Sequence, residues 1–111
     1  MTQIKQILDE FGIIHQASKN LPKELWNDLI LSLSELEDNE CHRLQMFPVT
    51  RLHKLEGVKE PIYRADINKV SGWRIHLQYV DKKLYLKDLL SQKQHDDPIR
   101  VVKSKQGRYE I

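Results

Sequence analysis

The spacing of apolar residues changes from a helical period to a strand period near Ile62, and this change limits the fold more than any other feature. Before it, an apolar stripe follows the 3.6-residue helical period over residues 22–37, after a typical helix start at Asn20-Leu21-Pro22. After it, apolar and polar residues alternate, as in strands with one buried face. The sequence therefore predicts an α+β domain in which N-terminal helices pack on a twisted antiparallel β-sheet.

Three strands are predicted in the second half of the chain, over residues 62–68, 73–80 and 84–90. The connecting segments 69–72 and 81–83 are short, so neighbouring strands are expected to pair antiparallel. Residues 99–102 are interpreted either as a further strand or as an ordered extension. Residues 103–111 are expected to form a mobile tail.

The N-terminal segment carries the apolar residues Ile4, Ile7, Leu8 and Phe11 at helical spacing. This spacing predicts a first helix over residues 3–11 that ends at Gly12. Residues 13–19 fit either a short strand or the continuation of a helical hairpin, and both interpretations stay open.

Length and composition indicate one folded domain over residues 1–111. The longest apolar run, Leu29-Ile30-Leu31, is far shorter than the ~20 residues that a membrane span needs. The first ten residues are interrupted by charge, unlike a secretory signal, and the lone Cys41 has no disulfide partner in the chain. We therefore expect a cytoplasmic location. The histidines show no metal-ligand spacing, so no metal is expected.

Charge is distributed unevenly along the chain. Residues 1–50 hold four bases and eight acids, a net charge of −4, whereas residues 51–111 hold 14 bases and eight acids, a net charge of +6. The basic half favours a polyanionic partner such as nucleic acid, although basic strand faces also keep a sheet soluble.

Polar residues of the first two predicted strands are expected to share the accessible face away from the helices. They are Arg64, Asp66, Arg74, His76 and Gln78. Guanidinium groups suit phosphate oxygens, and an imidazole or carboxylate can exchange a proton. The set suits a site that cleaves a phosphodiester bond, but it also fits an ordinary solvated sheet face with cross-strand Arg–Asp pairs.

Three segments occur in a fixed order: Lys54-Leu55-Glu56-Gly57, Ile62-Tyr63-Arg64-Ala65-Asp66-Ile67 and Ser71-Gly72-Trp73-Arg74-Ile75-His76-Leu77-Gln78-Tyr79-Val80-Asp81. With the preceding amphipathic helix, they resemble the RelE/ParE superfamily of bacterial toxin–antitoxin toxins over residues 21–97. The resemblance implies a RelE-like fold and a toxin that acts as a ribosome-dependent mRNA endonuclease. It implies no cofactor, because the attacking hydroxyl belongs to the RNA.

The resemblance also implies roles for single residues. Arg74 matches a family arginine that contacts the phosphate at the cleavage point, and Arg64 matches a basic position that stabilises the transition state. Asp66 stands where several nucleases have a second basic residue. Beyond the third strand the family often places a basic residue followed by tyrosine, whereas this chain offers Lys93 and His95 without the tyrosine. The implied RNA-binding residues are Arg64, Arg74, Gln78, Lys87 and Lys93.

The proton carrier is left open among His76, His95 and Asp66. The alternative function is a non-catalytic binding protein on the same scaffold, either of the gyrase-inhibitor type or a repurposed interaction domain. The expected partners are mRNA on the ribosome and a cognate antitoxin. An acidic or amphipathic antitoxin is expected to use Arg64, Arg74 and Lys87, and the helical stripe of Leu25, Leu29 and Leu36 is either core or part of its docking surface.

Overall fold

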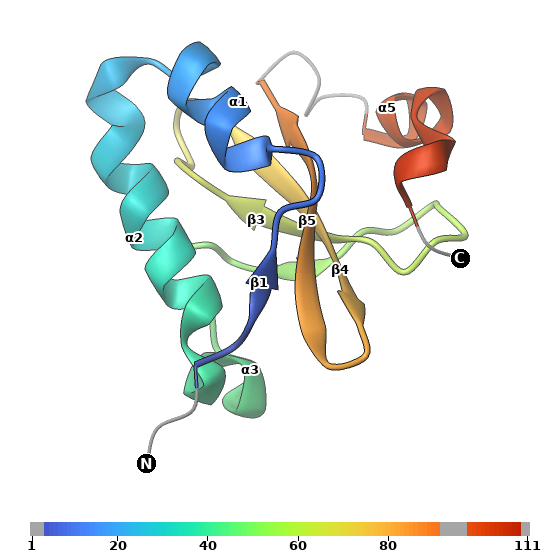
Figure 1. The fold of residues 1–111 in the computed structure, drawn as a ribbon, viewed down its shortest axis with the longest axis horizontal. Helices are drawn as coiled ribbons and strands as arrows, with labels where there is room; N and C mark the ends of the chain where they lie inside the picture. Colours follow the sequence, from blue (N-terminus) through green and yellow to red (C-terminus); the bar gives the residue numbers. More distant parts are fainter. Residues whose placement is uncertain (1–3, 92–97, 110–111) are drawn as a thin grey trace.

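A computed structural model describes residues 4–91 and 98–109, in which α1 and α2 lie on one side of a sheet and α5 on the other (Figure 1). The helices are α1 (Ile13–Asn20), α2 (Trp26–Glu37), α3 (Asn39–Leu44) and α5 (Pro98–Ser104), and the 3₁₀ turns are η1 (Lys23–Leu25) and η2 (Gln106–Arg108). The strands are β1 (Ile7–Leu8), β2 (His53–Lys54), β3 (Tyr63–Asp66), β4 (Arg74–Val80) and β5 (Lys83–Leu90). The predicted α+β class is confirmed.

The five strands form one sheet in the order β1-β5-β4-β3-β2. The pairs β2–β3, β3–β4 and β4–β5 are antiparallel, as predicted. Strand β1 pairs with β5 in parallel, so the prediction of a wholly antiparallel sheet is wrong at this edge. Helices and three strands separate β1 from β5 along the chain, which leaves ample length for a crossover between parallel strands.

The segment predicted as a helix over residues 3–11 contains β1 instead. Helix α1 begins only after Gly12. This residue adopts a left-handed backbone conformation, with a φ of 66°, so the chain turns between β1 and α1. A carboxylate oxygen of Asp9 accepts a hydrogen bond of 2.6 Å from the backbone N–H of Ile13, which satisfies a free donor at the helix start. The open segment 13–19 is therefore helical. The helix prediction is wrong because β1 has only two residues. A strand of this length shows too little alternation of apolar and polar residues to be recognised in the sequence, whereas the apolar residues around it happen to have helical spacing.

The main apolar core lies between the sheet and helices α1 and α2. Its buried members are Ile13, Ala17, Leu21, Leu29, Leu36, Ala65, Ile67, Ile75, Leu77, Leu84, Leu86 and Leu89. Fully burying one such leucine or isoleucine contributes ~1.5–3 kcal/mol. Helix α2 confirms the predicted stripe over residues 22–37 except for its first turn, which is the 3₁₀ turn η1 after Pro22.

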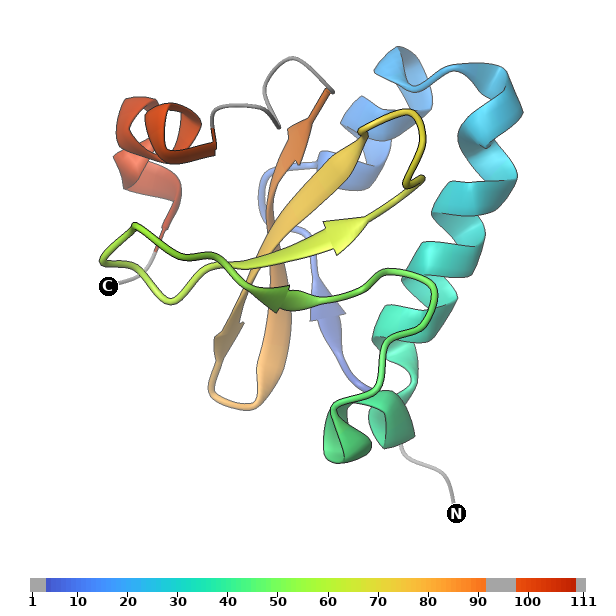
Figure 2. The same cartoon turned by 180° about the vertical axis from the view of Figure 1, so that it is seen from behind.

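The C-terminal segment packs on the opposite face of the sheet (Figure 2). A second apolar cluster comprises Leu55, Ile62, Val102 and Tyr109. Residues 99–102 are helical rather than a strand, and residues 103–109 continue through the end of α5 into η2. The reason is that Val102 and Tyr109 find an apolar patch on this face, which local alternation does not reveal. The mobility of the tail stays a prediction, and residues 110 and 111 lie outside the described residues.

Helix α3 is fastened to the sheet through the buried side chain of His42. Its Nε2 donates to the backbone carbonyl of Leu36, and its Nδ1 accepts from the Tyr79 hydroxyl, both at 2.7 Å. Burial lowers the pKa of His42 and raises the pKa of Tyr79 to about 12. The folded protein therefore favours the neutral imidazole.

We expect the free energy of unfolding to fall as the pH drops below the ordinary histidine pKa of 6.5. Below pH 6.5, His42 becomes protonated in the unfolded chain but stays neutral in the folded protein. The stability that the neutral, buried His42 contributes is therefore fully present above pH 6.5, and it is lost as the pH falls to the lowered pKa of the folded protein. Urea unfolding at about pH 7.5 and about pH 5.5 measures the loss. The variant His42→Gln is expected to remove this difference and His15→Gln, on an exposed histidine, to retain it. An unchanged pH effect in His42→Gln would contradict the assignment.

Candidate functional site

One polar residue from each of four strands lines up across the sheet. In order over β2, β3, β4 and β5 they are His53, Arg64, His76 and Asp88, here called the polar row. Directly opposite residues of antiparallel strands point to the same face. Asp66 lies opposite Arg74 beside the row, and Gln78 lies two residues beyond His76, so the predicted sharing of one face is confirmed.

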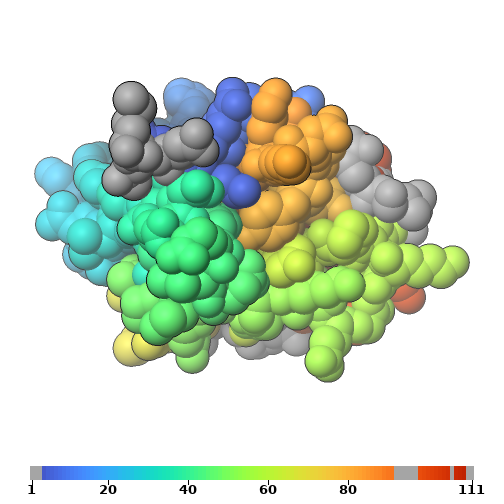
Figure 3. Space-filling model, turned by 90° about the horizontal axis from the view of Figure 1, so that it is seen from below, coloured from blue at the N-terminus to red at the C-terminus, as the bar shows by residue number. Residues whose placement is uncertain are grey.

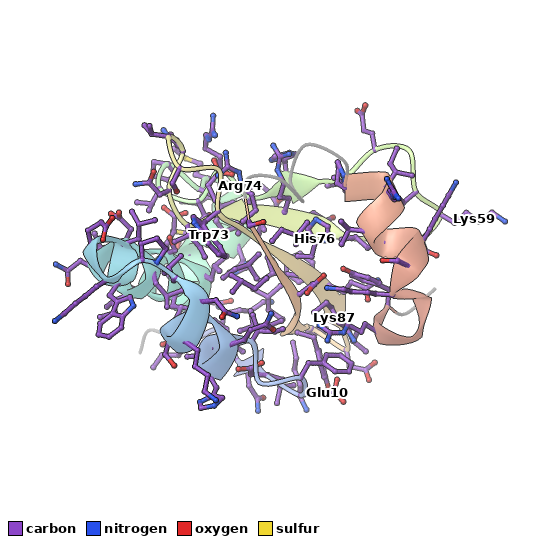
Figure 4. The ribbon with its side chains drawn as sticks, turned by 90° about the horizontal axis from the view of Figure 1, so that it is seen from above. Glu10, Lys59, Trp73, Arg74, His76 and Lys87 are labelled. Atoms are coloured by element: carbon purple, nitrogen blue, oxygen red, sulfur yellow. The ribbon has the colours of Figure 1, made fainter. Side chains whose placement is uncertain are left out.

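This face is the one turned away from α1 and α2. Figure 4 shows His76 on the side of α5 and Trp73 on the side of the N-terminal helices. Trp73, the residue before β4, packs against the main core, to which Ile75 and Leu77 of β4 belong. Strand alternation thus separates the polar from the apolar side chains, as the sequence predicted.

The C-terminal segment covers the β4–β5 end of the polar row. The Tyr109 hydroxyl lies 3.0 Å from His76 Nδ1. Asp88 is fully buried and accepts hydrogen bonds from Lys105 Nζ at 2.9 Å and from Arg108 Nη1 at 3.2 Å. Burial raises the pKa of Tyr109 well above its ordinary value. The row is therefore closed at this end.

The expected accessibility of the face is wrong for four of its residues. Asp66, Arg74, His76 and Gln78 are all buried. Tyr109 covers His76, and the guanidinium of Arg74 is folded back so that its Nη1 donates to the backbone carbonyls of Asn68 at 2.7 Å and Trp73 at 3.0 Å. Neighbouring segments, which strand alternation does not describe, supply this cover.

Lys87 is also buried, with 2% of its side chain exposed. It lies at a β-bulge, where β4 and β5 shift register. Its ammonium is 3.9 Å from a carboxylate oxygen of Glu10 and lies over the rings of Phe11 and Tyr85 (Figure 4). Lys87 thus anchors the segment before α1, and its side chain is buried rather than exposed.

Asp66 joins two arginines near the end of β3. Arg74 Nε lies 2.6 Å from Asp66 Oδ1, with both side chains buried. Arg51 binds Asp66 Oδ2 through its Nε and Nη2. Burial lowers the pKa of Arg74, and nearby Arg64 and Arg51 add to this effect while Asp66 opposes it. Two guanidiniums, those of Arg51 and Arg74, therefore share the one carboxylate of Asp66.

Helix α2 holds the loop that carries Arg51. The buried carboxylate of Glu35 accepts hydrogen bonds from the backbone N–H groups of Val49 at 2.7 Å and Thr50 at 2.8 Å, and from the Thr50 hydroxyl at 2.6 Å. The Thr50 carbonyl in turn accepts from the Asp66 N–H at 2.7 Å. The loop is thereby joined to both α2 and β3.

The β2 end of the polar row is open to solvent. Arg51 and His53 are exposed, and Arg64 is half-buried. Sequence reasoning missed Arg51 and His53, and their signal lay only in their alternate positions, just before β2 and at its first residue. Tyr109 was also missed. Lys93 and His95 lie outside the described residues.

Within residues 4–91 and 98–109, no three or more histidine, cysteine, aspartate or glutamate side chains are grouped to hold a metal ion. None of the helices in these residues is long and apolar enough to cross a membrane.

Some hollows of the described residues lie away from the polar row. Leu29 and Leu36 belong to the core, which confirms that interpretation of the stripe, while exposed Trp26 and Ile30 line an apolar pocket of about 180 Å³. A second pocket, of about 440 Å³, lies where residues 4–6, α3 and the β4–β5 turn meet (Figure 3). Both are separate from the site that the sequence predicts.

Comparison with known proteins bears on the fold. No family model matches the sequence, and no curated protein matches it significantly. The chain is similar to the crystal structure of the archaeal RelE–RelB complex from Pyrococcus horikoshii OT3, with a TM-score of 0.54 and 21% identity over 83% of this chain and 97% of that chain. The chain has a RelE-like fold. Within this RelE-like fold, the segments that carried the resemblance include Lys54 of β2 and the whole of β3 and β4, and they supply Arg64 and His76 of the polar row.

Proposed function

We propose that this chain is the toxin of a toxin–antitoxin pair and that it cleaves mRNA on the ribosome. The RelE-like fold supports this proposal, and one observation carries it: Arg64 lies opposite His76, beside the Asp66–Arg74 ion pair. Phosphodiester cleavage uses such neighbouring cations, proton carriers and carboxylates. The net charge of +6 in residues 51–111 favours a polyanionic substrate.

In the proposed reaction, the 2′-hydroxyl of the RNA attacks the adjacent phosphorus and the 5′-oxygen of the next nucleotide leaves. Arg64 stabilises the charge that develops on the phosphate. Arg74, in this proposal, contributes through its ion pair with Asp66 and binds the phosphate if the surrounding loop opens. The proton carrier among His76, His95 and Asp66 remains a prediction, as does RNA binding by Gln78, Lys87 and Lys93.

The decisive experiment is induced expression followed by mapping of mRNA 5′ ends. The wild-type chain is expected to arrest growth and to produce new ends. Arg64→Ala is expected to reduce their yield by ~10²-fold, the usual effect of removing one transition-state donor. Lys54→Ala is the matched control, because Lys54 is exposed on the neighbouring position of β2 and points to the other face. Normal growth with no new ends for the wild type would remove the nuclease proposal.

A cognate antitoxin belongs to the proposed function, since the similar solved structure is a complex of RelE with RelB. Titration with the product of a neighbouring small reading frame tests this partner. Binding through the basic half of the chain is expected to weaken at high ionic strength. Tight binding that ignores salt would place the partner on another surface.

A non-catalytic binding protein is the second candidate. The specific observation in its favour is the burial of Arg74 and His76, whose contacts go to backbone carbonyls, Asp66 and Tyr109. For the gyrase-inhibitor form, the purified chain is expected to block DNA supercoiling by gyrase. Full gyrase activity in an excess of the chain would count against it.

A further inference from the structure

We propose that the open end of the polar row is an RNA-backbone site, in which Arg51 and Arg64 bind phosphates and His53 accepts the proton of the attacking 2′-hydroxyl. The inference rests on the proposed function for its substrate. The groups that bind RNA and carry the proton then lie at the exposed edge strand β2, and not in the buried middle of the sheet.

The register of β2 and β3 brings these three residues together. His53 lies directly opposite Arg64, a geometry that places Cβ atoms roughly 5 Å apart. Arg51 lies two residues before His53, and its ion pair with Asp66 places its guanidinium beside the end of β3. Two guanidiniums and one imidazole therefore border a single patch at the sheet edge.

Charge favours an anion at this patch. Asp66 pairs with two guanidiniums, those of Arg51 and Arg74, so one positive charge remains in excess within this ion-pair cluster. The side chain of Arg51 is 48% exposed. Its contacts with Asp66 use Nε and Nη2, whereas a guanidinium has five N–H donors. Arg51 can thus hold Asp66 and a phosphate at the same time.

Arg51 also compensates for the acidic residue in β3. The resemblance implies a second basic residue in β3, but the chain has Asp66 at this position. Asp66 forms an ion pair with the guanidinium of Arg51, which lies in the adjacent loop. Glu35 fixes that loop through the backbone of Val49 and Thr50. A phosphate therefore meets an arginine that is already positioned, which lowers the entropy lost on binding.

His53 is the exposed imidazole of the polar row. Its Nδ1 lies 2.7 Å from the backbone carbonyl oxygen of Arg51. A carbonyl only accepts hydrogen bonds, so Nδ1 carries the proton and Nε2 of the neutral ring keeps the lone pair. His76, by contrast, lies buried against Tyr109. His53 is therefore the base that an RNA chain reaches without displacing the C-terminal segment.

The proposed step balances without a co-reactant. Nε2 of His53 takes the proton of the 2′-hydroxyl, the 2′-oxygen forms a bond to phosphorus, and the bond from phosphorus to the 5′-oxygen breaks. The proton returns through solvent to the departing 5′-oxygen. The products are a 2′,3′-cyclic phosphate and a free 5′-hydroxyl, and Arg51 and Arg64 hold the phosphate oxygens throughout.

Binding is tested with a fluorescently labelled single-stranded RNA oligonucleotide, by anisotropy over a series of salt concentrations. Arg51→Asn is expected to raise Kd by ~10-fold and to reduce the slope of log K against log salt by about 0.7, as for one lost phosphate contact. Asparagine suits the positive φ of 50° at this position. The matched control is Arg43→Asn, which removes an exposed arginine that is paired with Glu40 on α3.

Cleavage is tested with purified ribosomes that carry a defined mRNA. His53→Gln is expected to slow cleavage by at least ~10²-fold while it leaves the Kd for RNA unchanged. Added imidazole is expected to restore part of the rate in His53→Ala and none in Arg51→Asn. His15→Gln serves as the control, because His15 is exposed on α1, on the far side of the sheet.

The outcomes separate this site from the proposed function. Equal RNA affinity of Arg51→Asn and Arg43→Asn overturns the binding site, and full activity of His53→Gln overturns the role of His53. A wild type that binds RNA through Arg51 yet cleaves none overturns the nuclease function and the role of His53 but keeps the binding site. A wild type that ignores RNA and binds an acidic peptide through Arg51 overturns the RNA site in favour of a protein partner.

Discussion

Asp66→Ala is expected to lower the free energy of unfolding by about 3–5 kcal/mol, as when one member of a buried ion pair is removed. Both Asp66 and Arg74 are buried, and their Nε–Oδ1 distance is 2.6 Å. The substitution leaves the Arg74 guanidinium buried without its counter-charge. Urea unfolding followed by circular dichroism measures the change.

Two further variants sharpen this test. Glu40→Ala breaks the exposed ion pair with Arg43, and we expect its unfolding midpoint to match the wild type. The double variant Asp66→Leu with Arg74→Met is expected to be more stable than Asp66→Ala, because it buries no unpaired charge. Equal midpoints for Asp66→Ala and Glu40→Ala would show that the buried pair adds no stability.

Tyr109→Ala is expected to destabilise the protein by about 3–5 kcal/mol, the range for truncating a buried aromatic side chain. Tyr109 packs in the second apolar cluster and its hydroxyl lies 3.0 Å from His76 Nδ1. Tyr109→Phe removes the hydroxyl alone and is expected to cost about 1–3 kcal/mol. The difference between the two variants measures the apolar packing that holds the C-terminal segment on the sheet.

Hydrogen exchange locates the effect of Tyr109→Ala. The amides of β4 and of α5 are expected to exchange faster, because the cover over His76 loosens. Helices α1 and α2 lie on the other face of the sheet. Exchange of their amides is expected to speed up by no more than the loss of global stability explains. Equal stability of Tyr109→Ala and Tyr109→Phe would mean that the aromatic ring does not hold the segment in place.

Long segments with a clear period were predictable from the sequence. Helix α2 has a wide apolar stripe, and β3 and β4 alternate strictly enough to fix which side chains share a face. The predicted neighbours Arg64, Asp66, Arg74 and His76 do lie together. Local pattern decides these features because each depends on contacts within one element or between adjacent strands.

Short elements and distant cover were not predictable in the same way. Strands β1 and β2 have two residues each, so their sequence pattern is too short to predict the strand register. Without the register of β2, the position of His53 opposite Arg64 could not be predicted. The burial of His76 depends on Tyr109, which lies 33 residues further along the chain. Such a tertiary contact produces no periodic pattern in the sequence around Tyr109, so the sequence does not predict it.

The position of β5 in the sheet has a consequence for the order in which the molecule assembles during synthesis. Ile7 pairs with Leu84, so the first strand emerges long before its partner exists. Strand β5 then inserts between β1 and β4, and it supplies Leu84, Leu86 and Leu89 to the main core. Contacts of such long sequence separation form slowly. A nascent chain that stops before Lys83 therefore lacks the three leucines that β5 adds to the surface under helices α1 and α2. The polar row is complete only after β5, with Asp88, has been synthesised.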